Sequence, residues 1–303
     1  MAFVTASEVT HEFHFFRVYK DGRIEFLLQD SEKIRPFDDP VTGVQSKDVI
    51  ISPEPQVSAR IFLPKLKNPN QKFPLLFYIH GGGFCLRSAF SHRNHNFCSQ
   101  VAAKADFIVV SVEYGLFPAR PLPACYEDSW TALQWVASHA SGNGPEPWLK
   151  DHADFDRVSI SGNSAGGNIA HTLAFRVGTI GLPEGVKVVG MALVQPFFGG
   201  SEEEKMWLYM CPTNSGSDDP RLNPGMEDLA KIGCQRVLIF VAEKDALKVV
   251  AKNYYEKLKK SGFKGGVEIV EHESEGHTFH LKDPKSEKAG QLMEKLVSFL
   301  KQE

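Results

Sequence analysis

The sequence predicts an α/β fold in which helices cover both faces of a mostly parallel central sheet. From residue 73 onward, short apolar runs alternate with segments of helical periodicity, as expected of strand–helix–strand units. The runs are almost continuously apolar, which is typical of strands buried on both faces. The chain has no internal repeat or low-complexity block, so we expect residues 1–303 to form one domain.

The N-terminal part precedes this alternation and has a different pattern. Residues 15–28 predict a hairpin, because Lys-Asp-Gly at 20–22 is turn chemistry between two β-rich runs. Residues 57–64 alternate in polarity and end at Pro64, which predicts a further strand. We expect residues 1–35 to contribute to a cap over the top of the sheet.

The central region is expected to supply the sheet and the helices that cover it. Strands are expected at the apolar runs 75–80, 107–114, 157–162, 188–195, 236–243 and 267–272. Helices are expected at 129–140, 164–177, 253–262 and 287–301.

The strongest local signal is Gly162-Asn163-Ser164-Ala165-Gly166, which fits the pattern G-x-S-x-G between an expected strand and an expected helix. Side chains at either glycine would clash in so sharp a turn, and the turn lifts the serine above the sheet. The helix N-terminus directs the Ala165 N–H toward a developing oxyanion. The motif predicts Ser164 as a nucleophile and Ala165 as an oxyanion donor.

A second signal, His80-Gly81-Gly82-Gly83, directly follows the strand expected at 75–80. Three successive glycines are entropically costly and make sense where the backbone must approach a ligand. Gly82 and Gly83 are therefore predicted to supply oxyanion N–H groups, as in the HGGG motif of lipases and esterases. His80 is expected to fix this loop.

A serine hydroxyl needs a neighbouring base to act as a nucleophile. His277 and Asp245 follow the last two expected strands, and the chain order Ser, Asp, His is the one this type of site uses. Strand ends at one edge of an open sheet bring such residues together. Rival residues are expected to lie within a strand (His272 and Glu243) or too far beyond one (His280).

The remaining histidines and the cysteines suggest no further chemistry. His92 and His95 lack a carboxylate or cysteine at metal-ligand spacing, so surface or loop roles are expected for them. His171 lies two turns beyond Ser164 and is expected to pack in the core. The acidic run 202–204 is expected to begin a solvated helix, and the five dispersed cysteines are expected to be buried thiols.

Composition and the absence of certain motifs argue against several kinds of binding partner. The chain has 34 basic and 37 acidic residues and no basic stripe with interleaved aromatics, which argues against nucleic-acid binding. No window reaches the roughly 18 apolar residues that span a bilayer, and no targeting signal is evident, so a cytoplasmic location is expected. No nucleotide motif is present, so no cofactor and no metal are expected. The oligomeric state is left open.

With these motifs placed, the chain resembles plant carboxylesterases of the hormone-sensitive-lipase-like group, in the α/β-hydrolase superfamily. The resemblance runs from about residue 16 to the C-terminus and includes FRVYKDGRIE, HGGGFC, LPACYEDSW, HADFDRVSISGNSAGGNIAH, DDPRLNP, AEKDAL and EGHTFHL. It implies a single α/β-hydrolase domain without a cofactor. It also implies the triad Ser164, Asp245 and His277, with Gly82, Gly83 and Ala165 as oxyanion donors.

Relatives with other activities make alternatives worth testing. Gibberellin-receptor relatives lack the catalytic histidine, and hydroxyisoflavanone dehydratases carry threonine at the nucleophile position, whereas this chain has both His277 and Ser164. We expect a serine carboxylesterase acting on small to medium, largely apolar esters. The alternatives are a lyase or cyclase of a plant secondary metabolite, and a hormone-receptor-like protein with a vestigial triad. Four aromatic residues are candidate substrate-pocket walls: Phe84, Phe197, Phe198 and Trp207.

Three features depart from the resemblance. The family usually has Arg and Glu at the positions of Gly115 and Ala119, and the loss of both avoids an unpaired buried charge if these two normally pair. Asn163 replaces a more common Asp beside the nucleophile. The stretch 199–206 is shorter than usual, which predicts a more open pocket.

Overall fold

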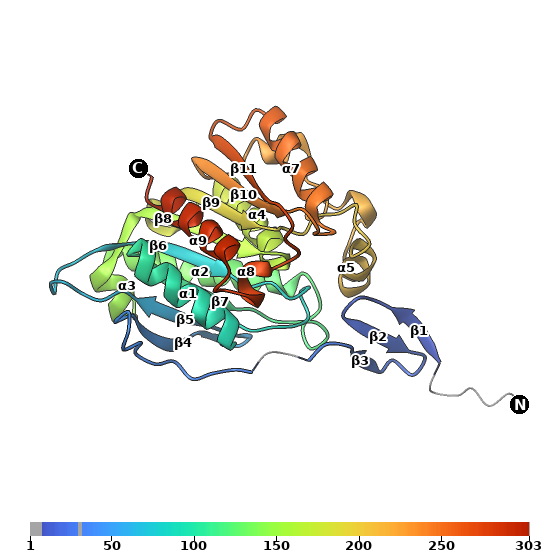
Figure 1. The fold of residues 1–303 in the computed structure, drawn as a ribbon, viewed down its shortest axis with the longest axis horizontal. Coiled ribbons are helices and arrows are strands. Elements are labelled where there is room, and N and C mark those ends of the chain that lie inside the picture. Colours follow the sequence, from blue (N-terminus) through green and yellow to red (C-terminus); the bar gives the residue numbers. More distant parts are fainter. Residues whose placement is uncertain (1–7, 30–31, 303) are drawn as a thin grey trace, which may run out of the picture.

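A computed structural model describes residues 8–29 and 32–302 of the chain. Their central feature is an eight-stranded sheet in the order β11-β10-β9-β8-β6-β7-β5-β4 (Figure 1). Its strands are β4 (Gln45–Pro53), β5 (Gln56–Leu63), β6 (Phe73–Ile79), β7 (Ile108–Glu113), β8 (Ala153–Asn163), β9 (Val188–Val194), β10 (Arg236–Ala242) and β11 (Gly266–His272). Strands β6 to β11 are parallel to one another, and β4 and β5 join as an antiparallel edge. The predicted mostly parallel sheet is confirmed.

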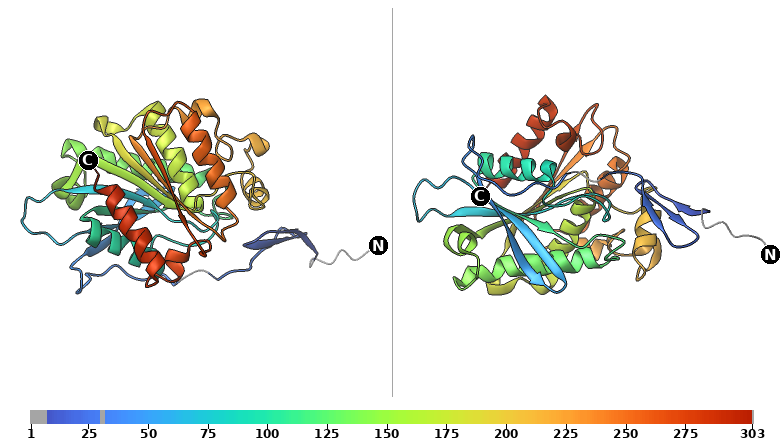
Figure 2. Two further views of the ribbon diagram at one scale, coloured as in Figure 1. Left: turned by 45° about the horizontal axis from the view of Figure 1, so that its top comes forward. Right: turned by 90° about the horizontal axis from the view of Figure 1, so that it is seen from below.

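Helices cover both faces of this sheet. The longer helices are α1 (His92–Ala105), α2 (Ala124–Ala137), α4 (Ala165–Ile180), α7 (Lys248–Lys260) and α9 (Glu287–Leu300). Shorter helices and 3₁₀ turns are α3 (Pro147–His152), α5 (Glu204–Met210), α6 (Met226–Leu229), α8 (Phe279–Lys282), η1 (Ser138–Ser141), η2 (Pro183–Gly185) and η3 (Gly216–Asp218). Helices α1 and α9 lie on the face opposite α2 and α4 (Figure 2), and each pair packs into its own core cluster.

The pattern of β10 explains why the strands look continuously apolar. Its alternate residues Val237, Ile239 and Val241 belong to the core on one face, and Leu238, Phe240 and Ala242 belong to the core on the other. Burial of both sets leaves no position for a polar side chain between Val237 and Ala242. Burying each large aliphatic side chain contributes about 1.5–3 kcal/mol, so both cores stabilise the sheet that carries the strand ends.

Some element boundaries differ from the sequence prediction. Helix α2 starts at Ala124, immediately after Pro123, and a 3₁₀ turn follows it, whereas a helix was expected at 129–140. Helix α7 starts at Lys248 and not at residue 253. Helix α1 and strand β4 were not expected from the sequence.

The N-terminal segment forms a separate three-stranded sheet of β1 (Val9–Glu12), β2 (Phe16–Tyr19) and β3 (Ile24–Phe26), and the predicted hairpin corresponds to β2 and β3. This sheet lies beside α5, away from the central sheet (Figure 1). Phe16 is fully buried, with its ring 5.3 Å from that of Phe117 and 6.2 Å from that of Tyr209. Within the expected cap region 1–35, residues 1–7 and 30–31 lie outside the described residues.

Candidate active site

The strand ends bring the predicted site residues together at one edge of the sheet. Ser164 follows β8, and the glycine loop 80–83 follows β6, which is the neighbouring strand. Asp245 and His277 follow β10 and β11, which are also adjacent. The crevice outside the carboxyl ends of parallel strands is where open α/β sheets bind ligands.

Ser164, His277 and Asp245 form a continuous hydrogen-bonded chain. The Ser164 Oγ lies 2.9 Å from His277 Nε2, and His277 Nδ1 lies 2.7 Å from Asp245 Oδ2. A carboxylate only accepts hydrogen bonds, so Nδ1 donates and Nε2 is left to accept the serine proton. The Asp245 side chain is 2% exposed, and its Oδ1 accepts a 2.9 Å bond from the Leu247 N–H. The carboxylate is therefore held in one orientation.

The backbone at Ser164 is strained, with φ 53° and ψ −121°. Non-glycine residues rarely adopt such angles, and they persist only where the surroundings impose them. A Cβ on Gly162 would come within 2.2 Å of the Gly166 carbonyl oxygen, and one on Gly166 within 2.1 Å of the Ile79 carbonyl oxygen. Both glycines of the motif are thus required by close backbone approach.

Three backbone N–H groups close to the serine have no partner among the described residues. Among the described residues, none accepts a hydrogen bond from the amides of Gly82, Gly83 or Ala165. Gly83 and Ala165 are buried, and Gly82 is half-buried. Buried amides almost always have a partner, so the unpaired amides of Gly83 and Ala165 have capacity to bind an oxygen of a ligand. The φ of +120° at Gly82 requires glycine there.

Asn163 connects the serine turn to the glycine loop, a role that the sequence did not reveal. Its Oδ1 accepts bonds of 3.0 Å from the Gly81 N–H and 2.9 Å from the Tyr78 hydroxyl. His80, on the same loop, is buried and stacks on the Tyr114 ring at 4.3 Å. These contacts fix the loop as predicted for His80.

Gln195 is a second residue that the sequence analysis missed. Its buried side-chain amide donates a 3.1 Å bond to the Gly276 carbonyl and accepts a 2.6 Å bond from the Thr278 N–H. Gly276 and Thr278 flank His277, so the amide holds the histidine loop from both sides. The only sequence signal was the position of Gln195 directly after β9.

Two cavities meet at Ser164 and His277, and both are also lined by His14 and Phe15 of the N-terminal segment. The first, of about 250 Å³, is lined by Phe84, Phe197, Met206 and Leu247, among other residues. We call it the apolar cavity. The second, of about 320 Å³, is lined by Leu28, Arg87, Arg93, Leu281 and Lys282, among other residues. We call it the cationic cavity.

Two of the four predicted pocket walls lie elsewhere. Phe198 stacks on Tyr254 at a ring separation of 4.2 Å and lines neither cavity. Trp207 is fully buried, and its Nε1 donates a 3.0 Å bond to the Tyr126 hydroxyl. Both side chains complete the packing around α4 and α5, while Met206, one residue before Trp207, faces the apolar cavity. Phe84 and Phe197 do line this cavity.

The rival residues lie outside the hydrogen-bonded chain. His272 ends β11, and His280 lies within α8, where burial lowers the pKa of its imidazole to about 3. Glu243 accepts a bond from the Ser274 N–H; it lies just after β10, not within the strand as expected. Cys85 is buried, which raises the pKa of its thiol to about 12 and keeps it protonated.

His95 differs from expectation because it is a core residue of α1, not a surface or loop residue. Its Nδ1 lies 3.1 Å from Nη1 of the buried Arg60, while His92 is exposed at the start of the helix. Within the described part of the chain, no three histidine, cysteine or carboxylate side chains are placed to hold a metal ion. His171 is buried against Tyr254, as predicted.

Gly115 and Arg120 both bond the carboxylate of Asp128. A Cβ at Gly115 would lie 2.6 Å from Cδ of Arg120, so the arginine side chain occupies this space. Arg120 bonds the buried Asp128 carboxylate at 2.8 Å, and the Gly115 N–H bonds its other oxygen at 2.8 Å. The Asp128 carboxylate therefore has both a cation and a backbone N–H as partners.

Comparison with known proteins shows the family to which the chain belongs. Residues 76–281 match a family model described as the alpha/beta hydrolase fold. The chain is 43% identical to a 2-hydroxyisoflavanone dehydratase of Glycyrrhiza echinata, over 98% of this chain and 97% of that protein. It is 42% identical to probable carboxylesterase 1 of Arabidopsis thaliana, over 95% and 96% of the two chains.

Solved structures extend the likeness in fold. An esterase of Pyrobaculum calidifontis superposes with a TM-score of 0.71 at 24% identity, covering 85% of this chain and 84% of that one. No helix of the described residues is long and apolar enough to cross a membrane. The extent of the family match and the likeness to plant proteins over nearly the whole length lead to one conclusion: this chain belongs to the alpha/beta hydrolase fold family and is related to plant carboxylesterases.

Proposed function

We propose that the protein is a serine carboxylesterase that hydrolyses small to medium carboxylic esters. The observation that carries this proposal is the Ser164–His277–Asp245 chain, with contacts of 2.9 and 2.7 Å, beside three unpartnered amides. A base within hydrogen-bond reach of a serine and a carboxylate that orients the base are the requirements for nucleophilic attack.

In the proposed reaction, Ser164 Oγ attacks the ester carbonyl while His277 Nε2 takes the hydroxyl proton. The carbonyl oxygen becomes an oxyanion that accepts bonds from Gly82, Gly83 and Ala165, and each such donor contributes on the order of 3 kcal/mol to the transition state. His277 then passes its proton to the departing alcohol. Water, activated by the same histidine, hydrolyses the acyl-enzyme and regenerates the serine.

A dehydratase is the second candidate, supported by 43% identity to the Glycyrrhiza echinata enzyme. In that reaction His277 would remove a proton from carbon, and a hydroxyl group would leave as water without an acyl-enzyme. Ser164 would then be dispensable as a nucleophile.

The decisive experiment compares the wild type with Ser164→Ala on 4-nitrophenyl acetate, butyrate and octanoate, and on a 2-hydroxyisoflavanone. We expect ester turnover in the wild type and its loss in the variant, with a shared thermal transition as the folding control. Isoflavanone turnover that persists in Ser164→Ala, without ester turnover in the wild type, would favour the dehydratase. Tight binding of either substrate without turnover would favour the receptor alternative.

The expected cytoplasmic location stays a prediction, which fractionation of plant tissue would test.

A further inference from the structure

The charged residues that line the cationic cavity are all basic. They are Arg87, Arg93 and Lys282, and no carboxylate is among the described residues that line it. The chain as a whole has more acidic than basic residues, 37 against 34, so composition does not account for this separation of charge. A cavity lined by one sign of charge attracts ligands of the other sign.

Two of these cations have no counter-charge among the residues that the structure describes. Arg93 and Lys282 are exposed, and no carboxylate of the described residues lies within 4.0 Å of either charged group. Arg87, by contrast, donates a 3.2 Å bond to the Gln29 carbonyl. Other surface cations do have carboxylate partners, as where Lys248 and Lys252 both contact Glu271.

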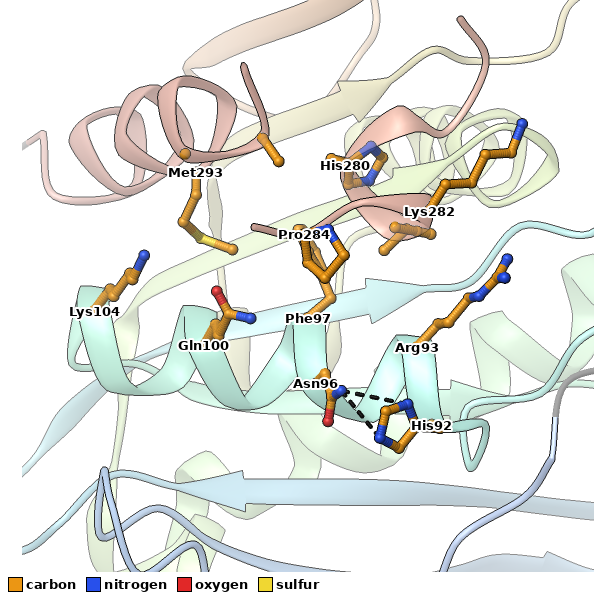
Figure 3. A pocket seen from close by; sticks show the side chains of 13 residues that line it. His92, Arg93, Asn96, Phe97, Gln100, Lys104, His280, Lys282, Pro284 and Met293 are labelled. Atoms are coloured by element: carbon orange, nitrogen blue, oxygen red, sulfur yellow. Dashed lines mark hydrogen bonds between the residues drawn. The ribbon is translucent and has the colours of Figure 1, made fainter. Parts of the chain in front are cut away.

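The same two side chains also line an adjoining groove of about 230 Å³ between α1 and α8–α9. Figure 3 shows Arg93 rising from α1 and Lys282 extending from the opposite wall, with both side chains reaching toward the same end of the groove. Lys104 adds a cation farther along, Phe97 and Met293 supply apolar surface, and again no described carboxylate lines the groove. The positive lining therefore continues from the serine along this path.

We propose that the substrate is an ester that also carries a carboxylate, which lies between Arg93 and Lys282 while the ester carbonyl lies at Ser164. The proposal rests on the proposed esterase function and adds the charge of the substrate to it. The uncharged half of the ester occupies the apolar cavity. A guanidinium and an ammonium from opposite walls hold a carboxylate in place, and the arginine supplies paired N–H donors.

The test uses two matched pairs of esters, because the carboxylate can belong to either half of the substrate. One pair is the butyryl ester of 4-hydroxybenzoate and that of its methyl ester. The other is the 4-nitrophenyl hemiester of succinate and its methyl-capped form. The readout is the ratio of kcat/KM for the anionic ester to that for its neutral partner, measured for the wild type, Arg93→Gln, Lys282→Gln and the double variant. Lys264→Gln removes an exposed cation that lines none of these cavities and is the control.

We expect the wild-type ratio to exceed one for at least one pair and to fall roughly fivefold with each cavity substitution, the upper range for an exposed ion pair. The ratio should remain at the wild-type value in Lys264→Gln. Added salt should lower the wild-type ratio and leave that of the double variant nearly unchanged, because salt screens exposed charges.

A ratio of one or less for both pairs, or a ratio that Arg93→Gln and Lys282→Gln leave unchanged, would overturn the inference while ester hydrolysis stands. If the wild type hydrolyses no ester, the proposed function fails instead. Calorimetric binding of the same pairs to Ser164→Ala then decides whether the preference for the anionic ligand exists without turnover. An anion that alters turnover of a neutral ester without competing with it would assign the cations to an effector and also overturn the proposal.

Discussion

The side-chain amide of Gln195 holds the backbone on both sides of His277. The amide donates to the Gly276 carbonyl at 3.1 Å and accepts from the Thr278 N–H at 2.6 Å. Its own backbone has a φ of 50°, a conformation that non-glycine residues adopt only under constraint. The Gln195 amide therefore restrains the backbone that carries His277. Asp245 restrains the rotation of the imidazole ring through its bond to Nδ1.

Gln195→Ala should lower kcat for 4-nitrophenyl butyrate by roughly tenfold or more, because small displacements of a catalytic group are costly. KM should change little, since Gln195 lines neither cavity. Gln195→Glu keeps the acceptor for Thr278 and loses the donor to Gly276, so its kcat should be intermediate. A loss of thermal stability with unchanged kcat would show instead that the residue only packs.

Asn163→Ala should also lower kcat, by removing the acceptor for the Gly81 N–H beside the two predicted oxyanion glycines. Asn163→Asp keeps that acceptor and should retain most of the activity. Steady-state kinetics of both variants on the same ester test this, with circular dichroism as the folding control. Equal activity of the alanine variant and the wild type would mean that the loop holds its shape without Asn163.

The roles of Asn163 and Gln195 could not be predicted from the sequence. The chain order and spacing of Ser164, Asp245 and His277 were visible because each residue follows an apolar strand. The bonds of Asn163 and Gln195 join residues that are 81 to 85 positions apart in the chain, and no local pattern encodes such contacts.

The same limit applies to parts of the fold. Helix α1 was not expected because several of its buried positions are polar, including Asn94, His95 and Ser99, which hides its periodicity. Its N-terminus is nevertheless capped by Ser91, whose side chain accepts a bond from the Asn94 N–H. Phe198 and Trp207 were equally suited by type to a pocket wall and to a core, and only packing separates the two outcomes.

Arg120→Met should destabilise the fold by roughly 1–3 kcal/mol, because it leaves the Asp128 carboxylate buried without its cation. Asp128 is 2% exposed in its side chain, whereas Arg120 is 29% exposed, so the larger cost of a fully buried pair is not expected. Arg157→Met, which removes an exposed pair with Asp154, is the matched control and should cost less than about 1 kcal/mol. Urea unfolding measures the free energy of unfolding of both variants.

Asp128→Asn in the Arg120→Met background should recover part of the lost stability. Purely additive effects of the two substitutions would argue against coupling between Arg120 and Asp128.

Acid should destabilise the fold through three buried histidines. Burial lowers the pKa of His95 to about 4, with Arg60 as the next cause, and burial lowers that of His171 and of His280 to about 3. In the unfolded chain all three titrate near 6.5. Because the folded-state pKa values are depressed, the neutral forms contribute stability that is fully present above pH 6.5. This stability is lost as the pH falls from about 6.5 toward 4 for His95 and toward 3 for the other two.

Each of these histidines adds one proton to the unfolded state in that range, so the free energy of unfolding should fall by about 1.4 kcal/mol per pH unit for each. His171→Gln keeps a group that can bond the Tyr254 hydroxyl and cannot be protonated, so its stability should decline less steeply by about this amount between pH 6 and 4.5. His92→Gln, at an exposed position on α1, is the control and should follow the wild type. Urea unfolding at several pH values measures the slopes. A His171→Gln slope equal to that of the wild type would mean that His171 is protonated in the folded state as readily as in the unfolded chain.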